Sequence, residues 1–174
     1  RRAAMPASMT AGGAYSEGFL AAAAALYDGH MGTENMGPLL YSLVRFLKPR
    51  QVLELGAGYT TIWILQALKD NDAELQSLEP DEDWWIPQIA SPSTLHCVDN
   101  MAHEHTTAHR AVEIARELGV DRYLAMHRED ASDFLAAAAA VAADPLRLDF
   151  VWVDGLLDLS HGDLGSFFTQ AEAL

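Results

Sequence analysis

Residues 51–61 read QVLELGAGYTT, a short β-prone run that leads into a glycine-rich turn. Residues 51–55 are typical of a strand, and residues 60–69 continue as a helix. Gly56 and Gly58 carry no side chain, so backbone amides can approach a ligand there, close to the positive end of the following helix. This order of strand, tight turn and helix predicts the first unit of a parallel α/β sheet.

The same alternation continues along the chain. Further strands are predicted over residues 94–99, 123–127 and 148–153, and the last is apolar enough to be covered on both faces. The predicted helices are residues 16–27, 36–47, 60–69, 103–118, 132–143 and 160–173. In the helix over residues 36–47 the apolar side chains share one face: Leu39, Leu40, Leu43, Phe46 and Leu47. Right-handed crossovers and a parallel sheet follow from this alternation.

Two segments stand apart from the predicted sheet. Residues 1–13 carry no periodicity and are interpreted as a disordered lead-in or an artificial extension, which leaves residues 14–174 as one domain. Residues 70–93 are longer than a usual connection and are interpreted as an insertion, either a surface elaboration or a lid. Within it, residues 75–79 offer an alternative strand that ends at Glu79.

Composition limits the partners of the chain. Its 174 residues carry a formal net charge of −14 at pH 7, which disfavours binding to nucleic acids and anionic membranes. The single cysteine, Cys97, lies in an apolar run and is interpreted as a buried thiol, which favours a reducing compartment. No apolar stretch approaches the ~20 residues that cross a bilayer. A cytoplasmic protein is expected.

Acidic residues follow the predicted strands, at the edge where open parallel sheets bind their ligands. Asp99 could accept both ribose hydroxyls of a nucleoside, and a turn or helix-start acid is the alternative. Asp130 could bind an adenine amino group while the amide of Ala131 meets a ring nitrogen. The alternative for Asp130 is a helix N-cap.

These residues, in this order, resemble the class I S-adenosylmethionine-dependent methyltransferases. The resemblance rests on VLELGAGYTT at 52–61, VD at 98–99, EDA at 129–131 and DFVWVDG at 149–155. The approach to the first strand, residues 37–49, is similar to that of the catechol-type O-methyltransferases. The resemblance implies a Rossmann-like three-layer α/β/α sandwich with a mainly parallel sheet. The family's last strands are missing, so we expect a piece of a longer chain or a partner over the sheet edge.

The resemblance also implies the cofactor S-adenosylmethionine, with S-adenosylhomocysteine as product. Glu54 and the glycine turn would surround the methionine part, Asp99 would hold the ribose, and Asp154 would face the acceptor. Glu79 is the substitute for Asp99, because the insertion lengthens the distance between the first two motifs. The cofactor-binding residues expected in this way are Glu54, Gly56, Ala57, Gly58, Thr60, Thr61, Asp99, Asp130, Ala131 and Asp154.

Candidate catalytic residues follow from the chemistry of methyl transfer, which chiefly requires alignment and needs a base only for a protonated acceptor. His161, with Asp163 beside it, is the first candidate base, His30 is the second, and Asp154 lies on the acceptor side. Whether magnesium is needed in addition stays open, because the resemblance places Asp154 where metal-dependent catechol-type members carry a magnesium ligand, and no metal ligand is assigned.

The histidines at 103, 105 and 109 raise a separate metal hypothesis. Only His105 and His109, spaced i and i+4 in a predicted helix, would share a face. No cysteine or third ligand stands nearby, so a solvated helix start is favoured over a zinc site.

The sequence therefore predicts a methyltransferase acting on a small aromatic or amino-acid-derived acceptor, with natural-product biosynthesis and a homodimer as further hypotheses. A nicotinamide-dependent oxidoreductase would carry a third glycine where Thr61 stands. A non-catalytic scaffold or binding protein on the same cofactor fold is the alternative from another class.

Overall fold

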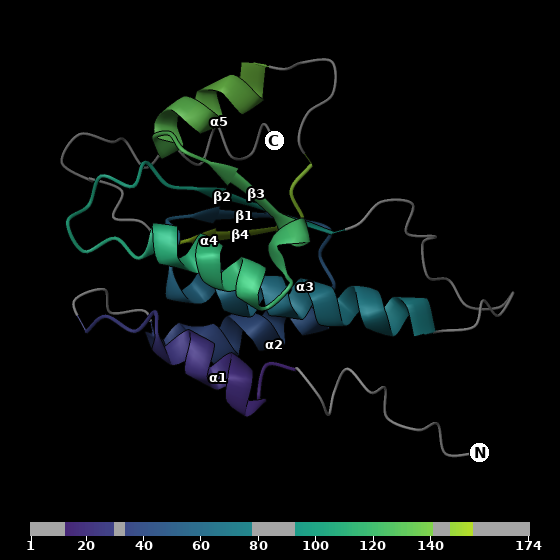
Figure 1. The fold of residues 1–174 in the computed structure, drawn as a ribbon. Helices are drawn as coiled ribbons and strands as arrows, with labels where there is room; N and C mark the ends of the chain where they lie inside the picture. The colour runs from purple at the N-terminus through teal and green to yellow at the C-terminus, as the bar shows by residue number, and fades with distance from the viewer. Residues whose placement is uncertain (1–12, 30–33, 78–92, 141–146, 155–174) are drawn as a thin grey trace, which may run out of the picture.

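A parallel sheet forms the centre of the computed structural model, which describes residues 13–29, 34–77, 93–140 and 147–154 (Figure 1). Its strands are β1 Gln51–Leu55, β2 Thr94–Val98, β3 Leu124–His127 and β4 Phe150–Val153. Their order in the sheet is β3-β2-β1-β4, and every neighbouring pair is parallel. The predicted Rossmann-like parallel sheet is confirmed, with strand bounds within two residues of those expected.

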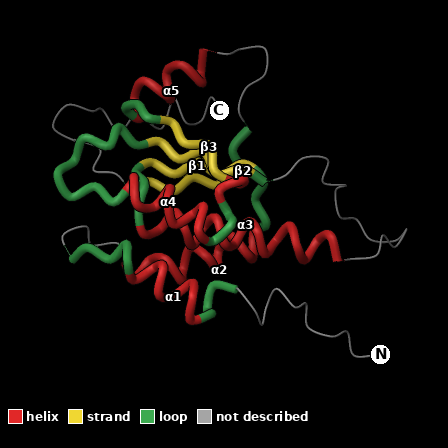
Figure 2. The backbone as a smooth tube through the Cα atoms, viewed as in Figure 1, coloured by secondary structure: helices red, strands yellow, loops and turns green. Residues whose placement is uncertain are grey.

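Helices cover both faces of the sheet (Figures 1 and 2). On one face lie α1 Glu17–Ala24, α2 Gly37–Leu47, α3 Tyr59–Ser77 and α4 Ala108–Glu117, while α5 Ala131–Ala140 lies on the other. Short 3₁₀ turns at Glu34–Met36 and Asp121–Tyr123 precede α2 and β3. No helix in the described ranges is both long and apolar enough to cross a membrane.

Side-chain alternation in β1 divides the core. Val52 packs with the large cluster under α2, α3 and α4, whereas Leu53 and Leu55 pack with Phe134 of α5. Successive residues of a strand point to opposite faces, so Glu54 shares the face of Val52. The pattern therefore places a carboxyl group inside the thicker helical layer, where Glu54 is 0% exposed.

Hydrogen bonds continue the sheet one residue beyond its strands. The amide of Gly56 donates to Val98 O at 2.8 Å, and the amide of Asp99 donates to His127 O at 3.0 Å. On the other side, the amide of Asp154 donates to Leu55 O at 2.9 Å. Gly56, Asp99 and Asp154 are thereby held at one edge of the sheet, where the strands have their carboxyl ends.

Helix α3 is longer than the predicted helix over residues 60–69, because it continues to Ser77. The alternative strand over residues 75–79 is therefore wrong at residues 75–77. Polar side chains beyond Lys69 do not end the helix, since α2 provides partners for them. The predicted insertion over residues 70–93 is therefore wrong at residues 70–77, which belong to α3. Residues 78–92 lie outside the described residues, so a lid there stays a prediction.

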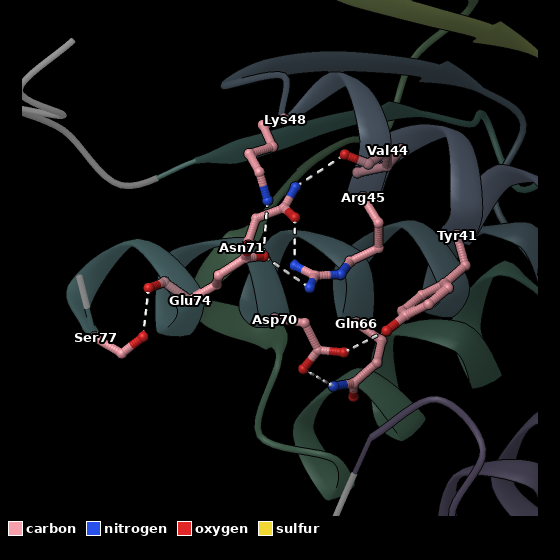
Figure 3. A network of polar contacts seen from close by, with 9 residues as sticks. All are labelled: Tyr41, Val44, Arg45, Lys48, Gln66, Asp70, Asn71, Glu74 and Ser77. Atoms are coloured by element: carbon pink, nitrogen blue, oxygen red, sulfur yellow. Dashed lines mark hydrogen bonds and ion pairs between the residues drawn. The ribbon is translucent and has the colours of Figure 1, made fainter. Parts of the chain in front are cut away.

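The polar contacts between α2 and α3 are drawn in Figure 3. Tyr41 Oη donates to Asp70 Oδ2 at 2.8 Å, and Arg45 donates to Asn71 Oδ1 at 2.5 Å and to Glu74 Oε2 at 2.8 Å. Lys48 Nζ also donates to Glu74, at 2.7 Å. Three polar residues of the second half of α3, namely Asp70, Asn71 and Glu74, are thus bonded to α2.

The apolar face predicted for α2 is largely exposed among the described residues. Leu40 is buried, but Leu39 is 48%, Leu43 37%, Phe46 83% and Leu47 52% exposed. Helix α2 instead approaches α3 through the positions of Gly37, Leu40 and Val44. Gly37 allows the close contact, because a Cβ there would lie 2.5 Å from the indole ring of Trp63.

Strand β4 also departs from the expectation that both of its faces are covered. Phe150 and Trp152 pack against the large core cluster, but Val151 and Val153 on the other face are 39% and 36% exposed. In the part of the chain that the structure describes, α5 reaches Leu53 and Leu55 but leaves these two side chains partly open.

Helix α4 begins at Ala108, five residues later than the predicted start at 103. His105 therefore lies before the helix and does not share a helical face with His109. Its amide donates to Nδ1 of His103 at 3.2 Å, which is a turn contact. The described residues contain no group of three or more His, Cys, Asp or Glu that could hold a metal ion.

Candidate functional site

The glycine turn after β1 forms the centre of the candidate site. Gly56 has a φ of 93°, a conformation that side-chain-bearing residues rarely adopt. Gly58 is needed for a different reason, because a Cβ there would lie 2.8 Å from Oγ1 of Thr107. The turn therefore depends on both glycines and brings its backbone close to the loop that precedes α4.

Asp99 holds this turn in place. Its Oδ2 accepts from the amide of Ala57 at 2.8 Å, and its Oδ1 accepts from the amide of Met101 at 2.6 Å. Charge-assisted bonds of this kind are about twice as strong as neutral ones. The carboxylate thus ties the end of β2 to the turn after β1, as the sheet topology predicts. Each oxygen keeps a second lone pair that can accept from a ligand.

Glu54 lies directly beneath the turn and is fully buried. Its Oε1 accepts from Thr60 Oγ1 at 2.7 Å, and its Oε2 accepts from Cys97 Sγ at 3.3 Å. Burial raises the pKa of Glu54 to about 7, the hydroxyl and thiol donors lower it, and the charge of Asp154 raises it. Glu54 is therefore a carboxyl group whose charge is sensitive to a nearby cation.

Cys97 is buried, as predicted. Burial, together with the neighbouring charge of Glu54, raises the pKa of the thiol well above its usual value. A thiol with a raised pKa is a weak nucleophile near neutral pH. Cys97 therefore serves as a hydrogen-bond donor to Glu54.

Thr60 and Thr61 direct their hydroxyls into the protein. Thr60 Oγ1 lies 2.9 Å from Asp154 Oδ2 in addition to its contact with Glu54. Thr61 Oγ1 accepts from the amide of Gly58 at 2.9 Å. The expected role of the two threonines in cofactor binding stays a prediction, and their hydroxyls are bonded to Glu54, Asp154 and the turn amide of Gly58.

Asp130 lies at the same edge, after β3. Its Oδ1 accepts from Asn100 Nδ2 at 2.7 Å, and its carbonyl accepts from the amides of Asp133 and Phe134 at the start of α5. Ala131 is the first residue of α5. The structure thus brings Asp130 next to the loop of Asp99, while its predicted contact with adenine stays a prediction.

Of the predicted catalytic residues, Asp154 alone falls within the described ranges. It stands at the edge, with its carboxylate turned toward Thr60. His161, His30, Asp163 and the substitute ribose ligand Glu79 lie outside the described residues. Their roles stay predictions.

Two features of this edge were not expected from the sequence. The hydrogen bond from Thr60 to Asp154 joins residues 94 positions apart, and no local sequence pattern predicts it. Asn100, which contacts Asp130, could have been noticed as a polar residue directly after Asp99. A third unexpected contact, on the α5 face, pairs Nδ1 of His96 with Nε2 of His127 at 3.2 Å.

Comparisons with known proteins agree with this geometry. A family model described as a methyltransferase domain matches residues 53–164. The O-methyltransferase TomG of Streptomyces achromogenes, involved in tomaymycin synthesis and solved with S-adenosylmethionine, is 25% identical with a TM-score of 0.56. The match covers 91% of this chain and 60% of TomG.

A second similar structure shows the same fold. The O-methyltransferase from Bacillus cereus, solved with S-adenosylhomocysteine, is 21% identical with a TM-score of 0.56, and the match covers 91% of this chain and 59% of that one. The chain thus spans about three fifths of each relative. No curated protein matches its sequence.

Proposed function

This chain belongs to the methyltransferase-domain family, and on that basis we propose that it transfers the methyl group of S-adenosylmethionine to a small-molecule acceptor. One observation carries the proposal. Asp99 accepts from the turn amide of Ala57, and Glu54, at the end of the neighbouring strand, contacts Thr60 directly after the turn. A glycine turn flanked by two acids suits a ligand with an ammonium group and ribose hydroxyls.

The residues at the edge fit the cofactor by their chemistry. Glu54 would balance the ammonium of its methionine part, Asp99 would accept from the ribose, and Asp130 with Ala131 would meet the adenine. When bound, the cofactor supplies a sulfonium-activated methyl group, with S-adenosylhomocysteine as the product. What the protein adds is alignment, which can account for a large part of such a barrier.

The acceptor that we propose is a hydroxyl of an aromatic or amino-acid-derived small molecule. Support comes from TomG, an O-methyltransferase involved in tomaymycin synthesis. Asp154 would face this acceptor at the carboxyl end of β4, and His161 or His30 would take the hydroxyl proton. Magnesium bound near the acceptor is the alternative to such a base. A cytoplasmic setting remains part of the proposal.

Calorimetric titration of the full-length protein with S-adenosylhomocysteine tests this function, with a nicotinamide dinucleotide as the control ligand. Micromolar binding of the first ligand alone is expected. Transfer of a labelled methyl group from S-adenosylmethionine to a panel of small phenols is then measured. Binding without transfer to any acceptor would favour the non-catalytic binding protein, and loss of both would defeat the proposal.

A further inference from the structure

Thr60 stands between two carboxyl groups. Its Oγ1 lies 2.7 Å from Oε1 of Glu54 and 2.9 Å from Oδ2 of Asp154. Thr60 and Glu54 are both 0% exposed, and the amide of Asp154 is bonded to the end of β1. The three side chains form a fixed row beneath the glycine turn.

The number of protons shared by Glu54, Thr60 and Asp154 determines which hydrogen bonds they can form. A hydroxyl donates one proton, and an ionised carboxylate can only accept. Thr60 can therefore satisfy one ionised carboxylate at a time, and the other would face an oxygen lone pair at hydrogen-bond distance. Both contacts are favourable only when one carboxyl group is protonated and donates to Thr60, while Thr60 donates to the other.

Glu54 is the group that holds this proton. Among the described residues, the groups that face it are Thr60 and Thr61 of α3, Cys97 of β2 and Asp154 after β4, and none of them is a cation. Burial and the charge of Asp154 raise the pKa of Glu54 to about 7. Near neutral pH a proton on Glu54 can thus be removed by a modest change in its surroundings.

We propose that Thr60 is a positioning residue that couples the protonation of Glu54 to the orientation of Asp154, so that binding of the cofactor releases one proton. The inference rests on the proposed function. Beside the ammonium group of a bound cofactor, Glu54 ionises and its proton passes to the solvent. Thr60 then donates to Glu54, and Asp154 exchanges its bond with Thr60 for a contact with the acceptor.

Calorimetry of the full-length protein with S-adenosylhomocysteine tests the coupling. Titrations at pH 6 and pH 8, each in two buffers of different ionisation enthalpy, count the protons released. A group with a pKa of about 7 predicts release of about one proton at pH 6 and nearly none at pH 8, with roughly tenfold weaker binding at pH 6. Binding without proton release at pH 6 would overturn the inference and leave the proposed function intact.

Variants identify the residues responsible. Glu54→Gln should lose the proton release at pH 6, whereas release through a histidine would persist. Thr60→Val removes a donor that lowers the pKa of Glu54, so this variant should still release a proton at pH 8. Thr60→Ser keeps the hydroxyl and should restore the wild-type pattern. Equal proton release at pH 8 in the wild type, Thr60→Val and Thr60→Ser would exclude Thr60 as the coupling residue. Failure of the wild type to bind at either pH would defeat both proposals.

Discussion

Glu54 is a carboxylic acid that the side-chain alternation of β1 buries in the core. The alternation of β1 places it on the face that carries Val52, where the core is otherwise apolar. Its carboxyl group persists there because Thr60 and Cys97 lie within hydrogen-bond distance of its two oxygens. A buried charge without such partners would cost several kcal/mol. The remaining free-energy cost of burying the charge raises the pKa of Glu54.

That raised pKa predicts how stability depends on pH. With a folded-state pKa of about 7 against an ordinary value of 4.5, Glu54 favours folding below pH 4.5, and this contribution is lost as pH rises to about 7. The free energy of unfolding should therefore fall by about 2 kcal/mol more in the wild type than in Glu54→Gln between pH 5 and pH 8. Urea denaturation at both values measures this, and parallel profiles would contradict it.

Gly58 provides a second test at single-residue resolution. Gly58→Ala places a Cβ 2.8 Å from Thr107 Oγ1, so Thr107 or the turn must shift. We expect binding of S-adenosylhomocysteine to weaken roughly tenfold, about 1.4 kcal/mol, because the turn backbone would contact the cofactor. Gly18→Ala is the matched control, since no atom lies within 4 Å of its Cβ in helix α1. Equal affinities in the two variants would remove the turn from the binding site.

Helices α2 and α3 are joined by a buried hydrogen-bonded residue and by exposed ion pairs, which contribute differently to stability (Figure 3). Asn71 is 1% exposed, donates to Val44 O at 2.9 Å and accepts from Arg45. Glu74 accepts from Arg45 and Lys48, but its side chain is 36% exposed. Exposed ion pairs contribute little, whereas a buried donor or acceptor that loses its partner is costly.

This contrast predicts different effects for two neighbouring substitutions. Asn71→Ala leaves the carbonyl of Val44 and the guanidinium of Arg45 without a partner from Asn71, and should lower the free energy of unfolding by about 2 kcal/mol. Glu74→Gln should lower it by less than about 1 kcal/mol. Chemical denaturation of both variants decides the point. A larger loss in Glu74→Gln would mean that the ion pairs, rather than Asn71, join the helices.

For the whole molecule, the distribution of charge singles out one surface. The chain carries a net charge of −14, yet residues 37–50 contain Arg45, Lys48, Arg50 and no acid. On α2 this region exposes Leu39, Leu43, Phe46 and Leu47, which we name the α2 stripe. The stripe itself carries no charge, and Glu74, the carboxylate beside it, is already paired with Arg45 and Lys48, so two acidic copies could meet here with little repulsion. This supports the proposal of a homodimer that pairs through the α2 stripe.

Sedimentation of the full-length protein tests that pairing. The wild type is expected to be a dimer, and Phe46→Ser should shift it to a monomer, because Phe46 is 83% exposed in the single chain. Leu20→Ser, at a 44% exposed site on α1, is the control and should remain a dimer. A wild-type monomer would refute the homodimer. If Phe46→Ser then also loses stability, another part of the full-length chain covers the stripe.

Local patterns were sufficient to predict the parallel sheet and the positions of Glu54, Gly56, Gly58 and Asp99 at its carboxyl edge. Strand alternation, glycine turns and helix periodicity act between residues a few positions apart, so their effects can be read along the chain. The same patterns misjudged α2, since four of the five apolar side chains assigned to one face are exposed. Periodicity shows that a helix has a face, but not which neighbour meets it.

Contacts between distant segments depended on the assembled sheet. The register of β1 with β4 brings Asp154 to Thr60, and that of β1 with β2 brings Cys97 to Glu54. Helix α3 continues past Lys69 to Ser77, and α2 supplies partners for its side chains Asp70, Asn71 and Glu74. Hydrogen bonds act over about 3 Å, so such pairs form only after folding has fixed the relative positions of whole elements.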